Sequence, residues 1–316
     1  MARSAPLQKP LQSTAIPGLV FPGPEFVGAP CKPGLVAELT HTVAREVRGP
    51  WSLITSREFW EGFPPAALVD QDAASALSTT FLVEADWSRA EVSVSQCGSN
   101  ASISVRGDGD LDQAAEQAAR FLALDVDARG WVDVARRDPV IADAQRELPG
   151  LRPCGFHSPY EAAAWAVLSQ RVRIVQAARL RDGVVNRHGD RGVFPTPQRL
   201  LSLDLDLPGR KGEYLRAVAE AALEGRLDCL ALRSMDLDDA VRAVQEVKGL
   251  GPFAAELVVL RGANAPDGLP THERRLDAEI SEQYGPGRTL DEVSAAWRPF
   301  RTWASVHLRV TGAAHP

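Results

Sequence analysis

The segment Val247-Lys-Gly-Leu-Gly-Pro-Phe253 decides how the C-terminal half of this 316-residue chain is interpreted. Before it, Asp236 is a suitable N-cap, and apolar residues recur at helical spacing at Leu237, Val241, Val244 and Val247. After the glycines, Pro252 occupies the favoured first position of a second helix. The segment is therefore predicted to be a helix, a tight glycine turn and a second helix.

The residues of the turn leave two interpretations open. Glycines at positions 249 and 251 would let a phosphate approach the backbone closely, and the free N–H groups at the start of a helix attract anions. A plain corner between two packed helices would use the same residues. The surrounding sequence has to decide between an anion-binding hairpin and a structural corner.

The charge distribution bears on whether that anion is DNA. The formal net charge of −6 argues mildly against a strongly basic nucleic-acid protein. Residues 1–150 hold 13 basic and 20 acidic residues, whereas residues 151–316 hold 22 and 21. If DNA is bound, we expect the C-terminal half to bind it.

Cysteine spacing and hydropathy exclude several other classes of protein. The four cysteines are scattered and lack the paired spacing of zinc or iron–sulfur sites, so no metal site is predicted. No window approaches ~18 consecutive apolar residues, and the start MARSAPLQKP lacks the apolar stretch of a signal peptide. We expect a cytoplasmic protein without a membrane segment.

The chain is predicted to divide into three parts. Residues 1–45 are expected to form a disordered or loosely packed tail, because the first 35 are rich in proline, glycine and serine. Residues 46–130 are expected to form an α+β domain, with antiparallel strands near 76–84, 90–94 and 101–105 and a helix over 111–124. Residues 131–316 are expected to be mostly helical, with helices over 158–173, 174–186, 197–203, 210–224, 237–247, 252–261, 275–284 and 290–312.

From Pro149 onward the chain resembles the helix-hairpin-helix DNA glycosylases of the AlkA (3-methyladenine DNA glycosylase II) type. The matching phrases stand in the family's order: Pro149-Gly-Leu-Arg-Pro, Ala166-Val-Leu-Ser-Gln170, Phe194-Pro-Thr-Pro-Gln-Arg-Leu, Ala221-Ala-Leu-Glu-Gly, Leu260-Arg-Gly and Trp297-Arg-Pro-Phe-Arg. The predicted sheet fits that family's N-terminal domain. The resemblance implies an α+β fold in which a small antiparallel sheet domain precedes a mostly helical helix-hairpin-helix glycosylase domain.

The resemblance also points to a catalytic carboxylate. Carried over without a gap from Arg261-Gly262, the family's catalytic aspartate falls on Glu273, whereas alignment on Leu269-Pro270 puts His272 there. The ungapped count also pairs Asp267 with an aspartate of the family, so Glu273 is preferred. Breaking an N-glycosidic bond builds positive charge on the deoxyribose, which a nearby carboxylate stabilises.

Further site residues follow from the same resemblance. DNA is expected to contact the hairpin at Lys248, Gly249, Leu250, Gly251 and Pro252. The turn that fills the gap left by a flipped base is expected at Gln170, Arg171 and Arg173, with Arg171 as the wedge.

The base pocket is expected to contain Phe253, Leu257, Arg309 and Trp165. Leu257 and Arg309 stand where the family has aromatic rings, and a guanidinium there would repel a cationic purine. Phe253 stands where bifunctional members carry a lysine nucleophile, so no Schiff base can form at that position. We therefore expect a monofunctional enzyme that leaves an abasic site uncut.

The expected function is excision of alkylated purines of the 3-methyladenine and 7-methylguanine type from duplex DNA by base flipping. Two alternatives remain open: a non-catalytic damaged-DNA-binding protein on the same scaffold, and a glycosylase for a different lesion. The expected partner is double-stranded DNA with damaged bases, bound by a monomer at the nucleoid. We expect that no cofactor is required. The hairpin carbonyls are a candidate site for a monovalent cation.

Overall fold

The computed structural model of the chain describes residues 39–62 and 76–314. They belong to one compact unit, residues 38–316. The prediction for the tail falls largely on residues 1–38, which lie outside the described residues.

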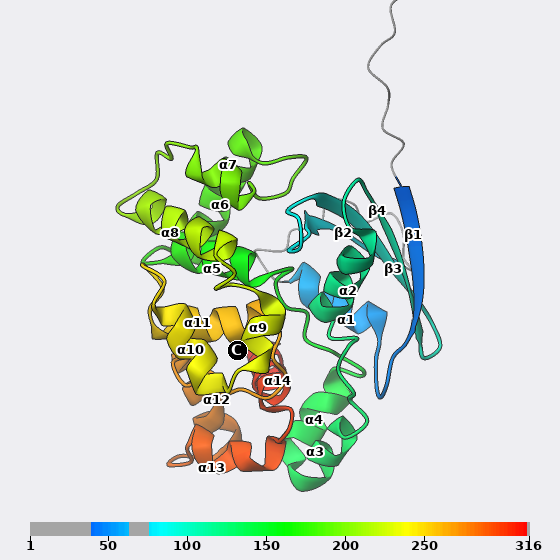
Figure 1. Cartoon of the computed structure of the whole chain (residues 1–316). Coiled ribbons are helices and arrows are strands. Elements are labelled where there is room, and N and C mark those ends of the chain that lie inside the picture. The colour runs from blue at the N-terminus through cyan, green and yellow to red at the C-terminus, as the bar shows by residue number, and fades with distance from the viewer. Residues whose placement is uncertain (1–38, 63–75, 315–316) are drawn as a thin grey trace, which may run out of the picture. The chain divides into compact units, whose positions relative to one another are not determined.

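An antiparallel sheet of four strands, in the order β1-β4-β3-β2, forms the N-terminal part. The strands are β1 (Leu39–Glu46), β2 (Ala76–Leu82), β3 (Arg89–Cys97) and β4 (Asn100–Gly107). In the register of β3 and β4, Val92 lies opposite Val105 and Val94 opposite Ile103, and all four side chains are buried. Helix α2 (Leu111–Phe121) packs over the sheet with its alanine-rich face, and α1 (Leu53–Glu61) adds Trp60 to the same core (Figure 1). The predicted small antiparallel sheet is confirmed.

Strand β1 corrects the N-terminal boundary. It starts at Leu39, inside the range 1–45 that was expected to be a tail, and its register pairs Val43 with Ile103. Among the described strands, β1 lies at the edge of the sheet and pairs with β4, some 60 residues later in the sequence. Because long-range pairing stabilises it, its own short alternation next to a proline- and glycine-rich stretch gives little local signal.

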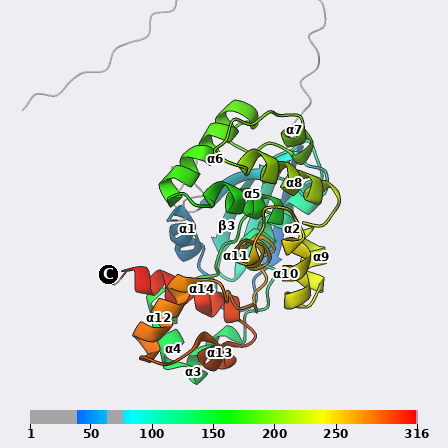
Figure 2. The same ribbon diagram turned by 90° about the vertical axis from the view of Figure 1, so that its left-hand side faces the viewer.

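The rest of the described chain is helical, as predicted. The helices are α3 (Trp131–Arg137), α4 (Pro139–Glu147), α5 (Pro159–Ser169), α6 (Ile174–His188), α7 (Pro197–Leu201), α8 (Lys211–Leu223), α9 (Cys229–Ser234), α10 (Leu237–Gln245), α11 (Pro252–Leu257), α12 (Arg274–Tyr284), α13 (Leu290–Ser294) and α14 (Arg301–Ala314). Helix α11 continues directly into a π-helical turn, η2 (Val258–Gly262). Figure 2 shows α11 nearly end-on, with α5, α10 and α14 around it. In the described part of the chain, no helix is long and apolar enough to cross a bilayer.

Arg152 joins the sheet region to the helical region. Its side chain is fully buried and donates to the backbone carbonyls of Arg48, Pro50, Ala123 and Val126. Burial lowers the pKa of this guanidinium to about 10, so it stays charged at neutral pH. With such contacts crossing residue 130, the division into domains at 46–130 and 131–316 stays a prediction.

The backbone ends one predicted helix early and divides another. The helix expected over 158–173 begins as predicted, because the Ser158 hydroxyl accepts from the Glu161 N–H at 3.2 Å, but it ends at Ser169. Arg171 has φ +54°, a left-handed conformation that an α-helix cannot continue through. The helix expected over 290–312 is divided into α13 and α14, with Pro299 between them, which lacks a backbone donor.

Glu84 makes the stability of the fold depend on pH. Its carboxylate lies 3.5 Å from Arg120 of α2, and burial raises the pKa of Glu84 to about 7, because Arg120 offsets only part of the desolvation. The folded protein therefore holds this proton more tightly than the unfolded chain, and the free energy of unfolding falls as pH rises from about 4.5 to about 7. We expect Glu84→Gln to remove this pH dependence, so that its free energy of unfolding relative to wild type is higher at pH 8 than at pH 4 by roughly 1–3 kcal/mol.

Urea unfolding at the two pH values measures the effect. Glu116→Gln, an exposed substitution on the same helix as Arg120, is the matched control and should give no pH-dependent gain. An equal gain from Glu84→Gln at both pH values would show that the ionised carboxylate is not what costs stability.

Candidate active site

Helices α10 and α11 form the predicted hairpin, and its two glycines have different roles. Gly249 has φ +96°, and a Cβ built there would lie 2.4 Å from the Tyr214 ring. At Gly251 a Cβ would meet nothing within 4 Å. The fold therefore requires Gly249, whereas Gly251 borders open space. The exposed Lys248 side chain places Nζ 2.5 Å from a carboxylate oxygen of Glu213 on α8.

The turn that follows α5 is tied to the hairpin. The Gln170 side-chain amide donates to the Gly249 carbonyl at 2.6 Å. Lys211, only 6% exposed, donates from Nζ to the carbonyls of Val167 (2.9 Å) and Gln170 (2.8 Å). These bonds hold Arg171 in an exposed, left-handed turn beside the hairpin, followed by the exposed Arg173. The structure thus brings the predicted wedge and hairpin residues together.

One face of α11 carries two of the predicted pocket residues and an acidic residue that was not predicted. Phe253, Glu256 and Leu257 share this face by helical spacing, and Phe253 is 52% exposed while Glu256 is buried. The Glu256 carboxylate accepts from the Thr271 hydroxyl and from the His272 backbone N–H at 3.0 Å. It also lies 2.7 Å from Nδ1 of His272. The loop before α12 is therefore held against the face that carries Phe253.

Glu273 is the last residue before α12, and it is paired rather than free. Its Oε1 accepts from Nε of Arg309 on α14 at 2.9 Å, while Nη1 of Arg309 donates to Glu279 at 2.9 Å. Burial lowers the pKa of the neighbouring Arg261, and the charge of Glu273 opposes that shift. A guanidinium at position 309 was expected to repel a cationic purine, and the structure flanks it with two carboxylates.

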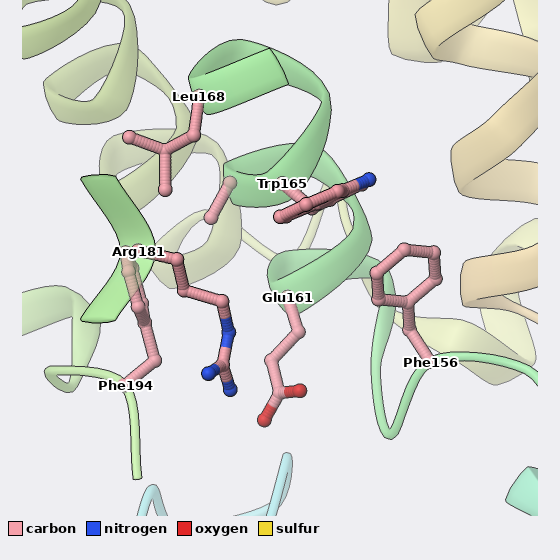
Figure 3. A pocket seen from close by; sticks show the side chains of 7 residues that line it. Phe156, Glu161, Trp165, Leu168, Arg181 and Phe194 are labelled. Carbon is pink, nitrogen blue, oxygen red and sulfur yellow. The ribbon is translucent and has the colours of Figure 1, made fainter. Parts of the chain in front are cut away.

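Trp165 lines a separate small cavity in the helical region (Figure 3). The other lining residues are Phe156, Glu161, Ala164, Leu168, Arg181 and Phe194. The cavity holds about 10 Å³, which is room for one water molecule and not for a nucleobase. In Figure 3 the Glu161 and Arg181 side chains extend next to each other along one side of the cavity. The assignment of Trp165 to a base pocket stays a prediction.

Sequence reasoning missed four residues that contact the predicted site residues: Glu256, Lys211, Glu213 and Glu279. Glu256 left a usable signal, because it is the only charged residue in the apolar run 254–260, and a charge there needs a buried partner. Lys211 and Glu213 gave none, since polar residues commonly start a helix. Among the described residues, no group of three His, Cys, Asp or Glu side chains could hold a metal ion.

The sequence is similar to curated DNA-repair proteins, although no family profile matches it. It is 28% identical over 204 residues to DNA-3-methyladenine glycosylase of Bacillus subtilis, covering 58% of this chain and 67% of that protein. It is 33% identical over 180 residues to DNA-3-methyladenine glycosylase 2 of Escherichia coli, covering 52% and 61%. The chain thus spans about two thirds or less of these relatives' lengths.

Solved structures share the fold. The 3-methyladenine DNA glycosylase of Archaeoglobus fulgidus aligns with a TM-score of 0.67 at 19% identity, over 86% of this chain and 98% of that one. The 8-oxoguanine glycosylase/lyase of Clostridium acetobutylicum, solved with double-stranded DNA, aligns with a TM-score of 0.59 at 14% identity, over 89% and 98%. Both likenesses cover the sheet as well as the hairpin, so the fold is shared along most of the chain.

Proposed function

We propose that this chain, which is similar in sequence and fold to 3-methyladenine DNA glycosylases, is a monofunctional glycosylase that excises alkylated purines from duplex DNA and leaves an abasic site. The substrates are of the 3-methyladenine and 7-methylguanine type. The observation that carries the proposal is the loop of Glu273, which Glu256 ties to the face of α11 that bears the exposed Phe253. A carboxylate and an aromatic ring then serve the same flipped nucleotide.

In this proposal the hairpin and the wedge turn bind the DNA. Lys248 and the backbone of 249–252 contact phosphate, and Arg171 enters the gap left by the flipped base, with Gln170 and Arg173 beside it. Phe253 and Leu257 contact the base, and the Phe253 ring attracts a cationic purine through its π face. Glu273 stabilises the positive charge that develops on the deoxyribose.

Because Arg309 is paired with carboxylates, its guanidinium is compatible with an alkylated, cationic base in the pocket. Two carboxylates, Glu273 and Glu279, flank this one guanidinium, so the local charge need not oppose a cation. An N3- or N7-alkylated purine also leaves as a neutral molecule, which reduces the need for a strong general acid. Phe253 offers no amine, so strand cleavage through a Schiff base is not expected.

The test is release of methylated bases from a methylated duplex. We expect 3-methyladenine and 7-methylguanine to appear as free bases, with strand breaks only after alkali treatment. Binding to abasic duplex without base release from any lesion would favour a damage-binding protein instead. Release of a non-alkylated lesion alone would favour a different substrate.

We take the enzyme to act as a monomer on nucleoid DNA in the cytoplasm, without a required cofactor. A monovalent cation at the hairpin carbonyls would have to compete with the Gln170 amide for the Gly249 oxygen. In this proposal such a cation is an additional ligand and is not required for activity.

Glu213 competes with DNA for Lys248 in this proposal. It also accepts two hydrogen bonds from Arg210, at 2.7 and 2.8 Å, and its cationic partners hold the pKa of Glu213 at about 2. We expect Glu213→Gln to tighten duplex binding by about 2- to 10-fold at low salt, because Lys248 becomes available to phosphate, and to lose the gain at high salt.

Fluorescence anisotropy with a labelled duplex at two salt concentrations measures this change in affinity. Glu224→Gln, in an exposed pair with Arg226 at the far end of α8, is the control for simple removal of a negative charge. An equal gain from both variants would mean that net charge, and not the release of Lys248, determines the affinity.

A further inference from the structure

Glu256 and His272 form a carboxylate–imidazole pair next to the proposed catalytic carboxylate. Glu256 is only 6% exposed, and both of its oxygens accept from the 271–272 loop. The imidazole itself is half exposed. A buried carboxylate beside Nδ1 fixes the ring proton on that nitrogen, so the lone pair of the neutral ring lies on Nε2. Among the residues that the structure describes, Nε2 has no hydrogen-bond partner.

We infer that His272, oriented by Glu256, is the general base that activates the hydrolytic water, and that Glu273 stabilises the developing sugar cation. This inference deepens the proposed function and rests on it. Activation of the water and stabilisation of the sugar cation, which a single carboxylate would otherwise perform, are then assigned to two adjacent side chains.

The contacts of Glu273 support this division. Its Oε1 already accepts from Arg309, so its lone pairs are directed partly to a permanent cation. Such a carboxylate still exerts a negative field on a sugar, while the hydrogen bond to Arg309 already occupies its Oε1. The His272 imidazole has a free acceptor nitrogen and a buried anion behind it, which is the arrangement by which a carboxylate holds a catalytic histidine in one tautomer and stabilises its imidazolium.

The proposed step balances without a further reactant. The water oxygen bonds to C1′ while the C1′–N bond breaks, and the electron pair of that bond passes to the purine and cancels its positive charge. The proton of the water passes to Nε2 of His272. The imidazolium is stabilised by Glu256 and then loses its proton to solvent.

Single-turnover release of 7-methylguanine by His272→Ala, with and without added imidazole, tests the inference. We expect a loss of about 10²-fold or more and partial recovery with imidazole, because a free base can enter the space that the side chain leaves. Imidazole should not restore Glu273→Gln, and His188→Ala, at the end of α6, should behave as wild type. Melting temperatures of all variants separate loss of base catalysis from loss of folding.

Glu256 is a positioning residue, and its readout is the split between affinity and rate. The groups facing the imidazole are Glu256 from α11 and the Thr271 hydroxyl, with the Glu273–Arg309 pair one residue further along. Glu256→Gln keeps an acceptor but removes the negative charge behind the ring, so the single-turnover rate should fall by about 10-fold while affinity for an abasic duplex stays within a few-fold of wild type.

Two results would overturn the inference: full activity in His272→Ala, or a loss that imidazole does not restore. Either would leave the proposed function intact as long as the wild-type protein releases the methylated base. Failure of the wild-type protein itself to release any methylated base would instead reject the proposed function.

Discussion

Replacing Glu273 by Gln should lower the rate of methylated-base release by about 10²-fold or more, because a carboxylate facing the developing sugar cation contributes that much to a typical transition state. The amide keeps the size of the side chain and can still accept from Arg309 of α14. The loss should therefore appear in the single-turnover rate, while affinity for an abasic duplex stays within a few-fold of wild type.

Glu279→Gln is the matched control for this substitution. Glu279 binds the same guanidinium as Glu273, but it lies within α12, more than a helical turn beyond the loop. Its removal should change the rate by less than about 3-fold if position relative to the sugar matters. Equal rates in the wild type and in Glu273→Gln would remove Glu273 from the mechanism, and equal losses in both variants would assign the effect to Arg309.

Gly249→Ala should destabilise the fold by roughly 3 kcal/mol, whereas Gly251→Ala should change the free energy of unfolding by less than about 1 kcal/mol. The first methyl group would meet the Tyr214 ring at 2.4 Å on a backbone with φ +96°. The second would project into open space from an extended backbone with φ −84°. Urea unfolding measures both differences.

Affinity for duplex DNA should not follow the stability of these variants. Gly251→Ala, although stably folded, should weaken duplex binding by about 10-fold, since its methyl group occupies the space by which a phosphate would reach the turn. A Gly251→Ala variant with wild-type affinity would mean that the hairpin is a structural corner. A Gly249→Ala variant of full stability would contradict the turn geometry.

Local signals predicted much of the fold. The N-cap at Ser158 and the cap at Asp110, whose carboxylate accepts from the Gln113 N–H at 3.0 Å, are short-range interactions that the sequence displays directly. The hairpin was predicted for the same reason. β1 was placed in the tail because its stability comes from pairing with a distant strand, and the left-handed Arg171 was included in a helix because no glycine marks the end of α5.

The sequence predicted residues of the candidate site but not the tertiary contacts between them. Glu273 and His272 were predicted from the sequence. Their partners Arg309 and Glu256 lie 36 and 16 residues away and are reached only through tertiary contacts. Arg309 shows the limit most clearly. Its charge alone suggested repulsion of the substrate, whereas its neighbours show that the same charge is largely compensated.

The Gln170 amide joins the wedge turn to the hairpin, and Lys211 binds the carbonyls at the end of α5 from which that turn starts. If the hairpin binds a phosphate, the distance between that phosphate and the gap left by the flipped base is then fixed. The enzyme would test only the nucleotide at that distance from the bound phosphate. To test the next nucleotide, it would have to dissociate from this phosphate and move along the strand.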